Sequence, residues 1–198
     1  MAIVFPCPLS VDAYVSLGRD LEVPRPDCPG CSVAMGFWGF YERDLRVGQV
    51  VRLLVRRARC PRCSSTHALL PDFVTHGRLD SIEVIGSGLE AMATGVGARS
   101  AAIGLDVPHT TVRDWRRRST VRARLLTSGF LAATVALGDL APRLVATGAL
   151  GTLIEAISAA VAAARRRLGA IGSEWRIANR IIGGHLLTTN TDLPWAAR

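Results

Sequence analysis

Apolar residues recur every three or four positions through the C-terminal two-thirds of the chain, the spacing of one face of an α-helix. This pattern predicts three short helices over residues 79–118 and three longer ones over residues 119–187. The longer helices should break where glycine and proline gather, near residues 138–142 and 169–172. Their defining apolar residues are Leu125, Leu126, Phe130, Leu131 and Val135; Leu150, Leu153, Ile154, Ile157, Val161 and Leu168; and Trp175, Ala178, Ile181, Ile182 and Leu186.

The N-terminal third has short runs of β-forming residues instead. Residues 3–5 form one such run, and a short helix is expected from Ser10, a suitable N-cap, to Arg19. Aromatic residues near position 40 and a Val- and Leu-rich stretch over residues 50–59 predict two strands, with Gly48 at the turn between them. Pro71 is expected to close this unit.

Four of the five cysteines form two Cys-x-x-Cys pairs, Cys28 with Cys31 and Cys60 with Cys63. Two such knuckles joined by a β-hairpin can place four sulfurs around one metal ion, so the pattern predicts a single structural Zn²⁺. A closed shell of four thiolates leaves no open position for a catalytic water. The alternative is two buried thiol pairs or a redox pair, but a thioredoxin-like pair should follow a strand and open a helix.

Two residues outside this set have open roles. Cys7 has no partner at motif spacing and is expected to be a buried thiol. His67 could compete as a metal ligand, although a histidine in such a place is more often a surface or packing residue.

The chain is strongly basic. Its net charge is +8, from 24 basic and 16 acidic residues, and every basic residue is arginine. The lack of lysine fits a G/C-rich genome, but the positive sign still favours a polyanionic partner. Residues 43–62 alone carry seven arginines and one acid. Some of these would offset thiolate charge, and the phosphate-facing candidates among them are Arg52, Arg56 and Arg57.

The aromatic residues in this β-rich region have two possible roles. Trp38, Phe40 and Tyr41 are expected to pack the hairpin rather than to stack on bases.

Residues 99–118 resemble the bacterial helix-turn-helix. The residues at its usual core positions are Ala102, Leu105, Val107, Val112 and Trp115. Pro108 suits the first position of the second helix. Asp106 is a departure, because glycine is commonest there, but aspartate tolerates the left-handed conformation better than most residues.

In that motif the second helix enters the major groove of double-stranded DNA. The candidates for reading base edges are His109, Thr110, Arg113 and Arg117, and Arg113 is expected to make a bidentate contact with a guanine. The candidates for phosphate contacts are Arg99, Arg116, Arg118, Arg122 and Arg124. The alternative is an ordinary amphipathic helix pair with a solvated basic face.

The expected fold class is thus mainly α with a small β zinc ribbon. An N-terminal segment (residues 1–24) precedes the ribbon (25–75), a helix-turn-helix (79–124), a helical bundle (125–187) and a tail (188–198). Residues 144–164 contain a single charge, Glu155, but their strong apolar residues share one helix face. This favours a core helix over a membrane span.

The ribbon, with Cys-Pro-Arg-Cys-Ser-Ser-Thr-His-Ala-Leu-Leu-Pro over residues 60–71, followed by the helix-turn-helix resembles the N-terminal DNA-binding part of bacterial insertion-sequence transposases. It is also similar to small bacterial proteins associated with mobile elements, which residues 175–191 resemble as well. Such transposases add a catalytic domain with three carboxylates on a mixed α/β fold. Beyond residue 119 this chain has no strand character and few acids, so no catalytic part is expected.

Three functions remain in competition. The favoured one is sequence-specific DNA binding, as a mobile-element accessory or a transcriptional regulator, by a cytoplasmic, nucleoid-associated protein that could act as a homodimer or with a transposase or recombinase. The second is an adaptor that docks a recombinase or polymerase without DNA affinity of its own. An enzyme is the least favoured, because clustered carboxylates and an open metal site are both missing from the pattern.

Overall fold

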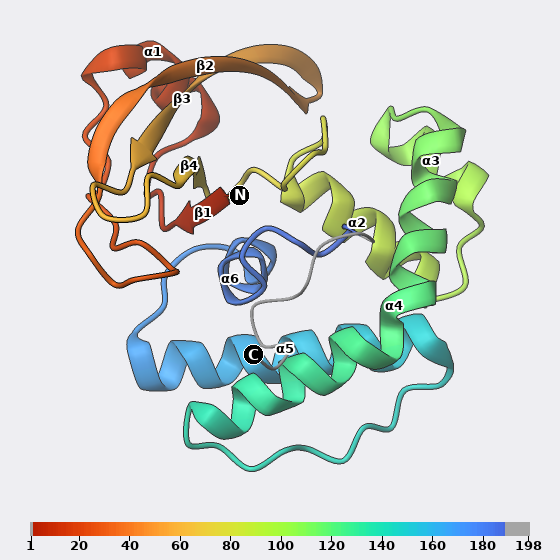
Figure 1. Cartoon of the computed structure of the whole chain (residues 1–198). Helices are drawn as coiled ribbons and strands as arrows, with labels where there is room; N and C mark the ends of the chain where they lie inside the picture. The colour runs from red at the N-terminus through yellow and green to blue at the C-terminus, as the bar shows by residue number, and fades with distance from the viewer. Residues whose placement is uncertain (1, 189–198) are drawn as a thin grey trace.

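The computed structural model describes residues 2–188, which form a four-stranded sheet beside a group of helices (Figure 1). The strands are β1 (Ala2–Phe5), β2 (Gly36–Val47), β3 (Gln49–Arg59) and β4 (Thr66–Pro71). The helices are α1 (Val11–Leu17), α2 (Ile82–Ala93), α3 (Ala98–Leu105), α4 (His109–Ala136), α5 (Gly148–Leu168) and α6 (Glu174–Ile181), with a 3₁₀ turn, η1 (Gly18–Asp20), after α1. Residues 189–198, most of the predicted tail, lie outside the described part.

The sheet contains the predicted hairpin and extends beyond it. Strands β2 and β3 pair in antiparallel register around Gly48, which has a φ of 91°, so the predicted turn is confirmed. Strand β4 pairs antiparallel to β3, and β1 pairs parallel to β4, giving the order β1-β4-β3-β2. The fold is therefore mixed α/β rather than mainly α. The sequence pattern missed β4 because this short strand depends on β1, about 60 residues away, for its other partner.

The helices share one apolar core. The predicted third short helix is the start of α4, which continues for 28 residues and crosses the expected boundary between residues 124 and 125. Trp115 before that boundary and Phe130 after it belong to the same buried cluster. The two segments expected here, 79–124 and 125–187, thus have a common core. The predicted breaks after α4 and after α5 are both present.

Helix α5 is long and apolar enough to cross a membrane by length and composition alone. The core helix of a folded domain has the same properties, and Leu153, Ala156 and Ile157 on its apolar face are fully buried against neighbouring helices. This burial matches the helix face that the sequence pattern predicts.

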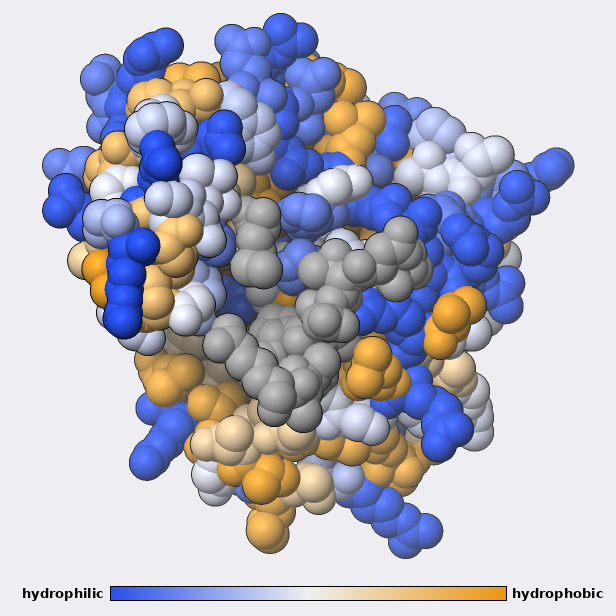
Figure 2. Space-filling view, viewed as in Figure 1, coloured by the Kyte–Doolittle hydropathy of each residue, from blue (hydrophilic) through white to orange (hydrophobic). Residues whose placement is uncertain are grey.

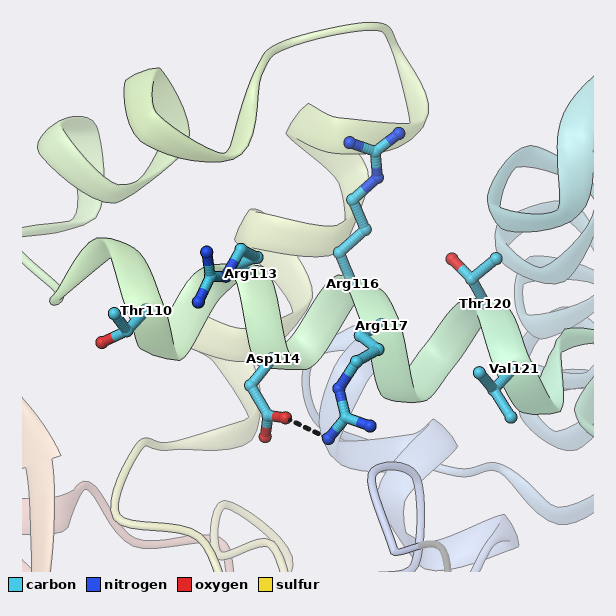
Figure 3. A pocket seen from close by; sticks show the side chains of 7 residues that line it. All are labelled: Thr110, Arg113, Asp114, Arg116, Arg117, Thr120 and Val121. Carbon is cyan, nitrogen blue, oxygen red and sulfur yellow. Dashed lines mark hydrogen bonds and ion pairs between the residues drawn. The ribbon is translucent and has the colours of Figure 1, made fainter.

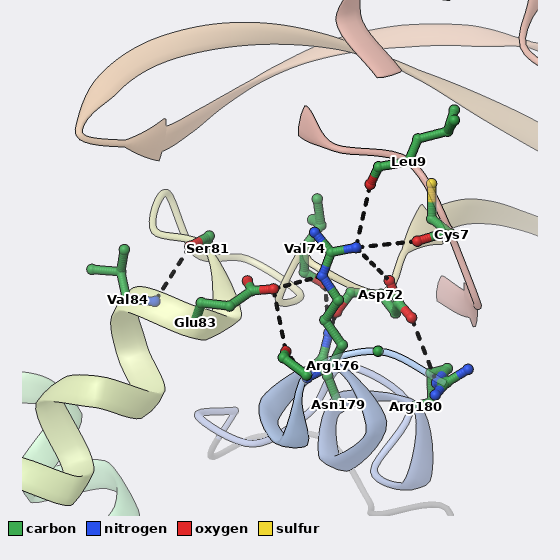
Figure 4. A network of polar contacts seen from close by, with 12 residues as sticks. Cys7, Leu9, Asp72, Val74, Ser81, Glu83, Val84, Arg176, Asn179 and Arg180 are labelled. Atoms are coloured by element: carbon green, nitrogen blue, oxygen red, sulfur yellow. Dashed lines mark hydrogen bonds and ion pairs between the residues drawn. The ribbon is translucent and has the colours of Figure 1, made fainter. Parts of the chain in front are cut away.

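Helix α6 joins the two layers, because it packs against α2, α5 and β1. Its Arg176 donates to Glu83 of α2 at 2.6 Å and to the backbone carbonyls of Cys7 and Leu9 at 3.1 and 3.3 Å (Figure 4). Arg176 and Arg180 also lie 3.8 and 3.5 Å from the buried carboxylate of Asp72. This network fixes the sheet in place beside the helices.

Candidate metal centre and basic helix face

The two cysteine knuckles have the same backbone geometry. In the first, the Ser32 N–H donates to the Cys28 carbonyl at 2.8 Å, and the Cys28 N–H donates to Val33. In the second, the Ser64 N–H donates to the Cys60 carbonyl at 3.0 Å, and the Cys60 N–H donates to Ser65. Each serine has a positive φ, 53° for Ser32 and 59° for Ser64, which lets the chain turn back after its second cysteine.

The hairpin brings the two knuckles together. The sulfur atoms of Cys31 and Cys60 are 3.3 Å apart, those of Cys28 and Cys63 are 3.6 Å apart, and all four lie within 4.8 Å of one another. Four sulfurs at about 2.3 Å from a tetrahedral ion would be about 3.8 Å apart. The cluster therefore fits one metal ion, as the sequence pattern predicts.

The protein environment already favours thiolates at one knuckle. Hydrogen bonds from the side chain and backbone of Ser65 lower the pKa of Cys63 to about 6, and backbone hydrogen bonds from the second knuckle also lower the pKa of Cys60. In contrast, the hydrogen bond with Cys60 is the main cause that raises the pKa of Cys31 to about 12. Cys60 and Cys63 thus lose their thiol protons more readily than Cys31 does. A bound cation would favour the thiolate form of all four cysteines.

The two residues left open by the sequence lie apart from the metal cluster. His67 is buried on β4, and neither of its ring nitrogens has a hydrogen-bond partner. It is a packing residue, which was the more expected of its two roles. Cys7 is a free, buried thiol, as predicted.

Helices α3 and α4 meet at a short turn of three residues. Asp106 ends α3 in the left-handed conformation, with φ 51° and ψ 47°, so the departure from glycine is accommodated. Pro108 is the N-cap of α4, one position earlier than expected. Trp115 packs the two helices onto α2, where a Cβ on Gly88 would lie only 3.1 Å from its ring. Of the predicted core positions, four are buried and Leu105 is partly buried.

The first four turns of α4 present a polar, basic face to solvent. Thr110, Arg113, Arg116 and Thr120 are exposed on it, and His109 is half-buried. Figure 3 shows the side chains of this face around an open hollow that is also lined by Val121. On the face of the molecule in Figure 2, strongly hydrophilic side chains gather over this region, at the right of the view.

Asp114 forms ion pairs with arginines of this face, a role that the sequence pattern did not indicate. It accepts hydrogen bonds from Arg117 at 2.7 Å and from Arg118 at 2.6 Å, and Arg78 lies 3.5 Å away. Burial alone would raise the pKa of Asp114, but the hydrogen bonds from Arg117 and Arg118 bring it below its ordinary value. The spacings of three and four residues on one helix could have identified the first two partners. No local sequence pattern could have identified Arg78 as a partner, because it lies far from Asp114 along the chain.

The predicted base-reading residues thus lie close together, but their side chains are not equally free to contact a ligand. Arg113 is exposed, and no ion pair engages it within the described residues. Arg117 is exposed but paired with Asp114. Among the expected phosphate contacts, Arg99, Arg116 and Arg124 are exposed on α3 and α4.

The other arginines expected to face phosphate have partners within the protein. Arg52 lies beside Glu42 and Asp44, although its side chain remains 66% exposed. Arg118 and Arg122 are partly buried, and Arg122 donates to Thr188. On the sheet, Arg57 donates to Thr66, and Arg56 donates to the carbonyls of Arg19 and Leu21. Arg56 therefore has partners within the fold, and the phosphate role expected for it stays a prediction.

Residues 28–115 match the family model described as Domain of unknown function (DUF6431). The match starts at the first metal-site cysteine and ends within α4, at Trp115. The matched residues include all four clustered cysteines and the α3–α4 turn. No curated protein and no solved structure matches the chain.

Proposed function

We propose that this protein is a zinc-stabilised, non-catalytic protein that binds double-stranded DNA in a sequence-specific way. The N-terminal turns of α4 lie in the major groove. A zinc ribbon is formed by β2, β3 and the two knuckles, and its hairpin turn at Gly48 lines a hollow together with Pro108 and His109 at the start of α4. The observation that carries the proposal is the pairing of a buried inner face of α4, at Val112 and Trp115, with an exposed basic outer face.

The left-handed residue between α3 and α4 supports a helix-turn-helix. It lets two helices meet through three residues while Ala102 and Val112 are both buried in the same apolar core. In this arrangement Arg113 is the main base-reading residue, helped by His109 and Thr110. Arg117, whose guanidinium pairs with Asp114, is a further base-reading residue. Arg99, Arg116 and Arg124 contact phosphates of the duplex.

Zinc is the ion that the cluster suits best. Four sulfur ligands at tetrahedral spacing are typical of structural zinc, and such a shell leaves no position for substrate or water. The ion would join the two knuckles at their outer side, because Cys28 and Cys60 are buried whereas Cys31 is half-buried and Cys63 is exposed. Its role is to stabilise the ribbon, with the four cysteines as its only ligands.

A homodimer is part of the proposal. Beyond Thr120, α4 carries exposed apolar residues beside the exposed Arg124: Val121, Leu125 and Val135 are 75%, 46% and 54% exposed. Apolar residues on the exposed side of a recognition helix suit contact with a second copy, which would present two α4 helices to a two-fold-symmetric site. The expected links to a mobile element, to a transposase or recombinase, and to the cytoplasm stay predictions.

The test is selection of bound duplexes from a random DNA library by zinc-loaded protein at near-physiological salt. Enrichment of one sequence motif is expected, and an inverted repeat would support the dimer. A matched selection with Arg113→Ala should lose preference at one position of the motif. If no motif is enriched, the proposal is wrong in its specificity, and an adaptor role becomes the better explanation.

A further inference from the structure

A second surface, on the opposite end of the sheet from the hairpin turn, carries exposed aromatic rings beside arginines. Trp38 is 58% exposed and Phe37 is 40% exposed. Of the three aromatic residues expected to pack the hairpin, Phe40 and Tyr41 are half-buried, whereas Trp38 differs from that expectation. The rings of Phe37 and Trp38 lie at the start of β2, next to the second knuckle. We call the surface formed by Arg25, Phe37, Trp38, Arg56 and Arg59 the Arg–aromatic surface.

The backbone turns these rings outward. The β2–β3 register shifts between Phe37 and Gly39, so the strand has an irregularity at Trp38. Such a bulge redirects a side chain that would otherwise follow the strict alternation of the strand. It leaves two neighbouring aromatic residues, Phe37 and Trp38, both in contact with solvent.

Each ring has a guanidinium above it. Arg59 lies 4.7 Å from the ring centroid of Trp38, and Arg56 lies 4.6 Å from that of Phe37. Arg25 lies 5.6 Å from Phe37. Within the described residues neither Arg25 nor Arg59 has a carboxylate partner, so their positive charge is not neutralised by the fold.

Four of these residues, Arg25, Phe37, Trp38 and Arg59, line one groove, together with Pro61 and Ser64 of the second knuckle. Aromatic rings and unneutralised cations thus lie side by side in it. This combination matches a nucleotide, whose base stacks on an aromatic ring and whose phosphate pairs with a guanidinium. A duplex cannot use these rings in this way, because its base faces are already stacked on one another.

We propose that the Arg–aromatic surface binds single-stranded nucleic acid, with one base stacked on Trp38 and the neighbouring phosphates held by Arg25 and Arg59. This site lies on different residues from the basic face of α4 and takes a different ligand. It therefore does not depend on the function proposed for α4.

Fluorescence anisotropy of labelled twelve-nucleotide oligo(dT) and oligo(rU), titrated with the full-length zinc-loaded protein, tests this site. Trp38→Ala should weaken binding by roughly tenfold or more, the usual effect of losing one base–aromatic stack. Arg59→Gln should also weaken it, and more than Arg52→Gln, which removes an equal charge from the other end of the same strand. Comparison of the two oligonucleotides tells DNA from RNA as the preferred strand.

Three control measurements separate a loss of this site from unfolding and from a loss of duplex binding. Trp38→Ala should keep the wild-type unfolding midpoint, because its side chain is largely exposed, and it should keep the duplex preference set by Arg113. Arg113→Ala should in turn keep oligo(dT) affinity. Equal affinities of wild type and Trp38→Ala, or equal losses in Arg59→Gln and Arg52→Gln, would overturn the proposal. Absence of binding to both oligonucleotides would also overturn it and would favour an acidic protein segment as the partner.

Discussion

The indole ring of Trp175 on α6 lies directly over the Cα of Gly86 on α2. A Cβ at position 86 would be 2.2 Å from Cδ2 of the ring, far closer than any stable contact. The same ring donates a hydrogen bond from Nε1 to Glu90, one turn further along α2, at 2.7 Å. Glycine inside a helix destabilises it by up to about 1 kcal/mol relative to alanine, so its presence here is explained by the close approach of α6.

Gly86→Ala should therefore destabilise the protein by about 1–3 kcal/mol, despite the better helix propensity of alanine. The added methyl group forces α6 away from α2 and loosens the Arg176 network that attaches the sheet. Urea unfolding of the metal-loaded protein measures the change. Gly104→Ala is the matched control, because a Cβ at that helical position meets nothing within 4 Å. A neutral or stabilising Gly86→Ala would mean that the two helices can separate without loss.

Cys28→Ser and Cys60→Ser should each lose the metal ion and unfold the ribbon, since each removes one of four thiolates. Elemental analysis of the purified variants gives the metal-to-protein ratio. Cys7→Ala is the control, because Cys7 is buried outside the cluster and should leave one ion per chain. Retained stoichiometric metal in both serine variants would refute the four-cysteine site.

Arg113→Ala should relax base preference at one position and weaken binding to the selected motif by about 1–3 kcal/mol. Arg99→Ala should instead weaken binding to all duplexes alike and reduce the slope of log affinity against log salt by about 1. Competition binding with the motif and its single-base variants separates these effects. A uniform loss in Arg113→Ala would make that residue a phosphate contact.

Asp114→Asn should tighten non-specific duplex binding, because it removes a negative charge from the basic face and releases Arg117 and Arg118. It should also reduce stability by roughly 0.5–1 kcal/mol near neutral pH.

The lowered pKa of Asp114 means that its ion pairs stabilise the fold above pH ~4 and stop doing so as the pH falls through the folded-state value. The stability difference between wild type and variant should thus disappear at acid pH. A constant difference down to pH ~2 would show that the charge is not responsible.

Two neighbouring histidines, one half-buried and one buried, should make the stability of the fold decrease in mild acid. The rings of His76 and His185 are 5.1 Å apart, and burial lowers the pKa of each, with further lowering by the positive charges of Arg43, Arg78 and Arg122. A lowered pKa in the folded state means that the unfolded chain takes up protons first. Stability should then fall as the pH drops below ~6.5, the ordinary histidine value.

The denaturation midpoint of wild type and His76→Gln between pH 8 and 5 measures this effect. The variant should lose part of the wild-type slope, because one titrating ring and its repulsion on the other are gone. Both proteins keep the same cysteines, so any loss of metal in acid affects them equally. Identical slopes would contradict the prediction.

Several features of this protein follow from local sequence alone. The four cysteines, the turn at Gly48, the N-cap at Ser10 and the left-handed residue at Asp106 all depend on the chemistry of a few neighbouring positions. The buried face of α4 follows in the same way from helical spacing. These elements were predictable because capping, turn conformation and helical periodicity act over distances of one or two turns.

Tertiary contacts decided the rest. Strand β4 exists beside β1, Gly86 is required by Trp175, and Arg56 and Arg118 have internal partners, whereas Arg113 faces solvent. In the sequence all 24 arginines are alike in charge, so no pattern could tell a free guanidinium from a paired one. That distinction depends on which acids and carbonyls are brought close from distant parts of the chain. The sequence by itself therefore determined the four cysteines of the candidate metal site and the helix pair, and only the folded structure decided which charges remain available to a partner.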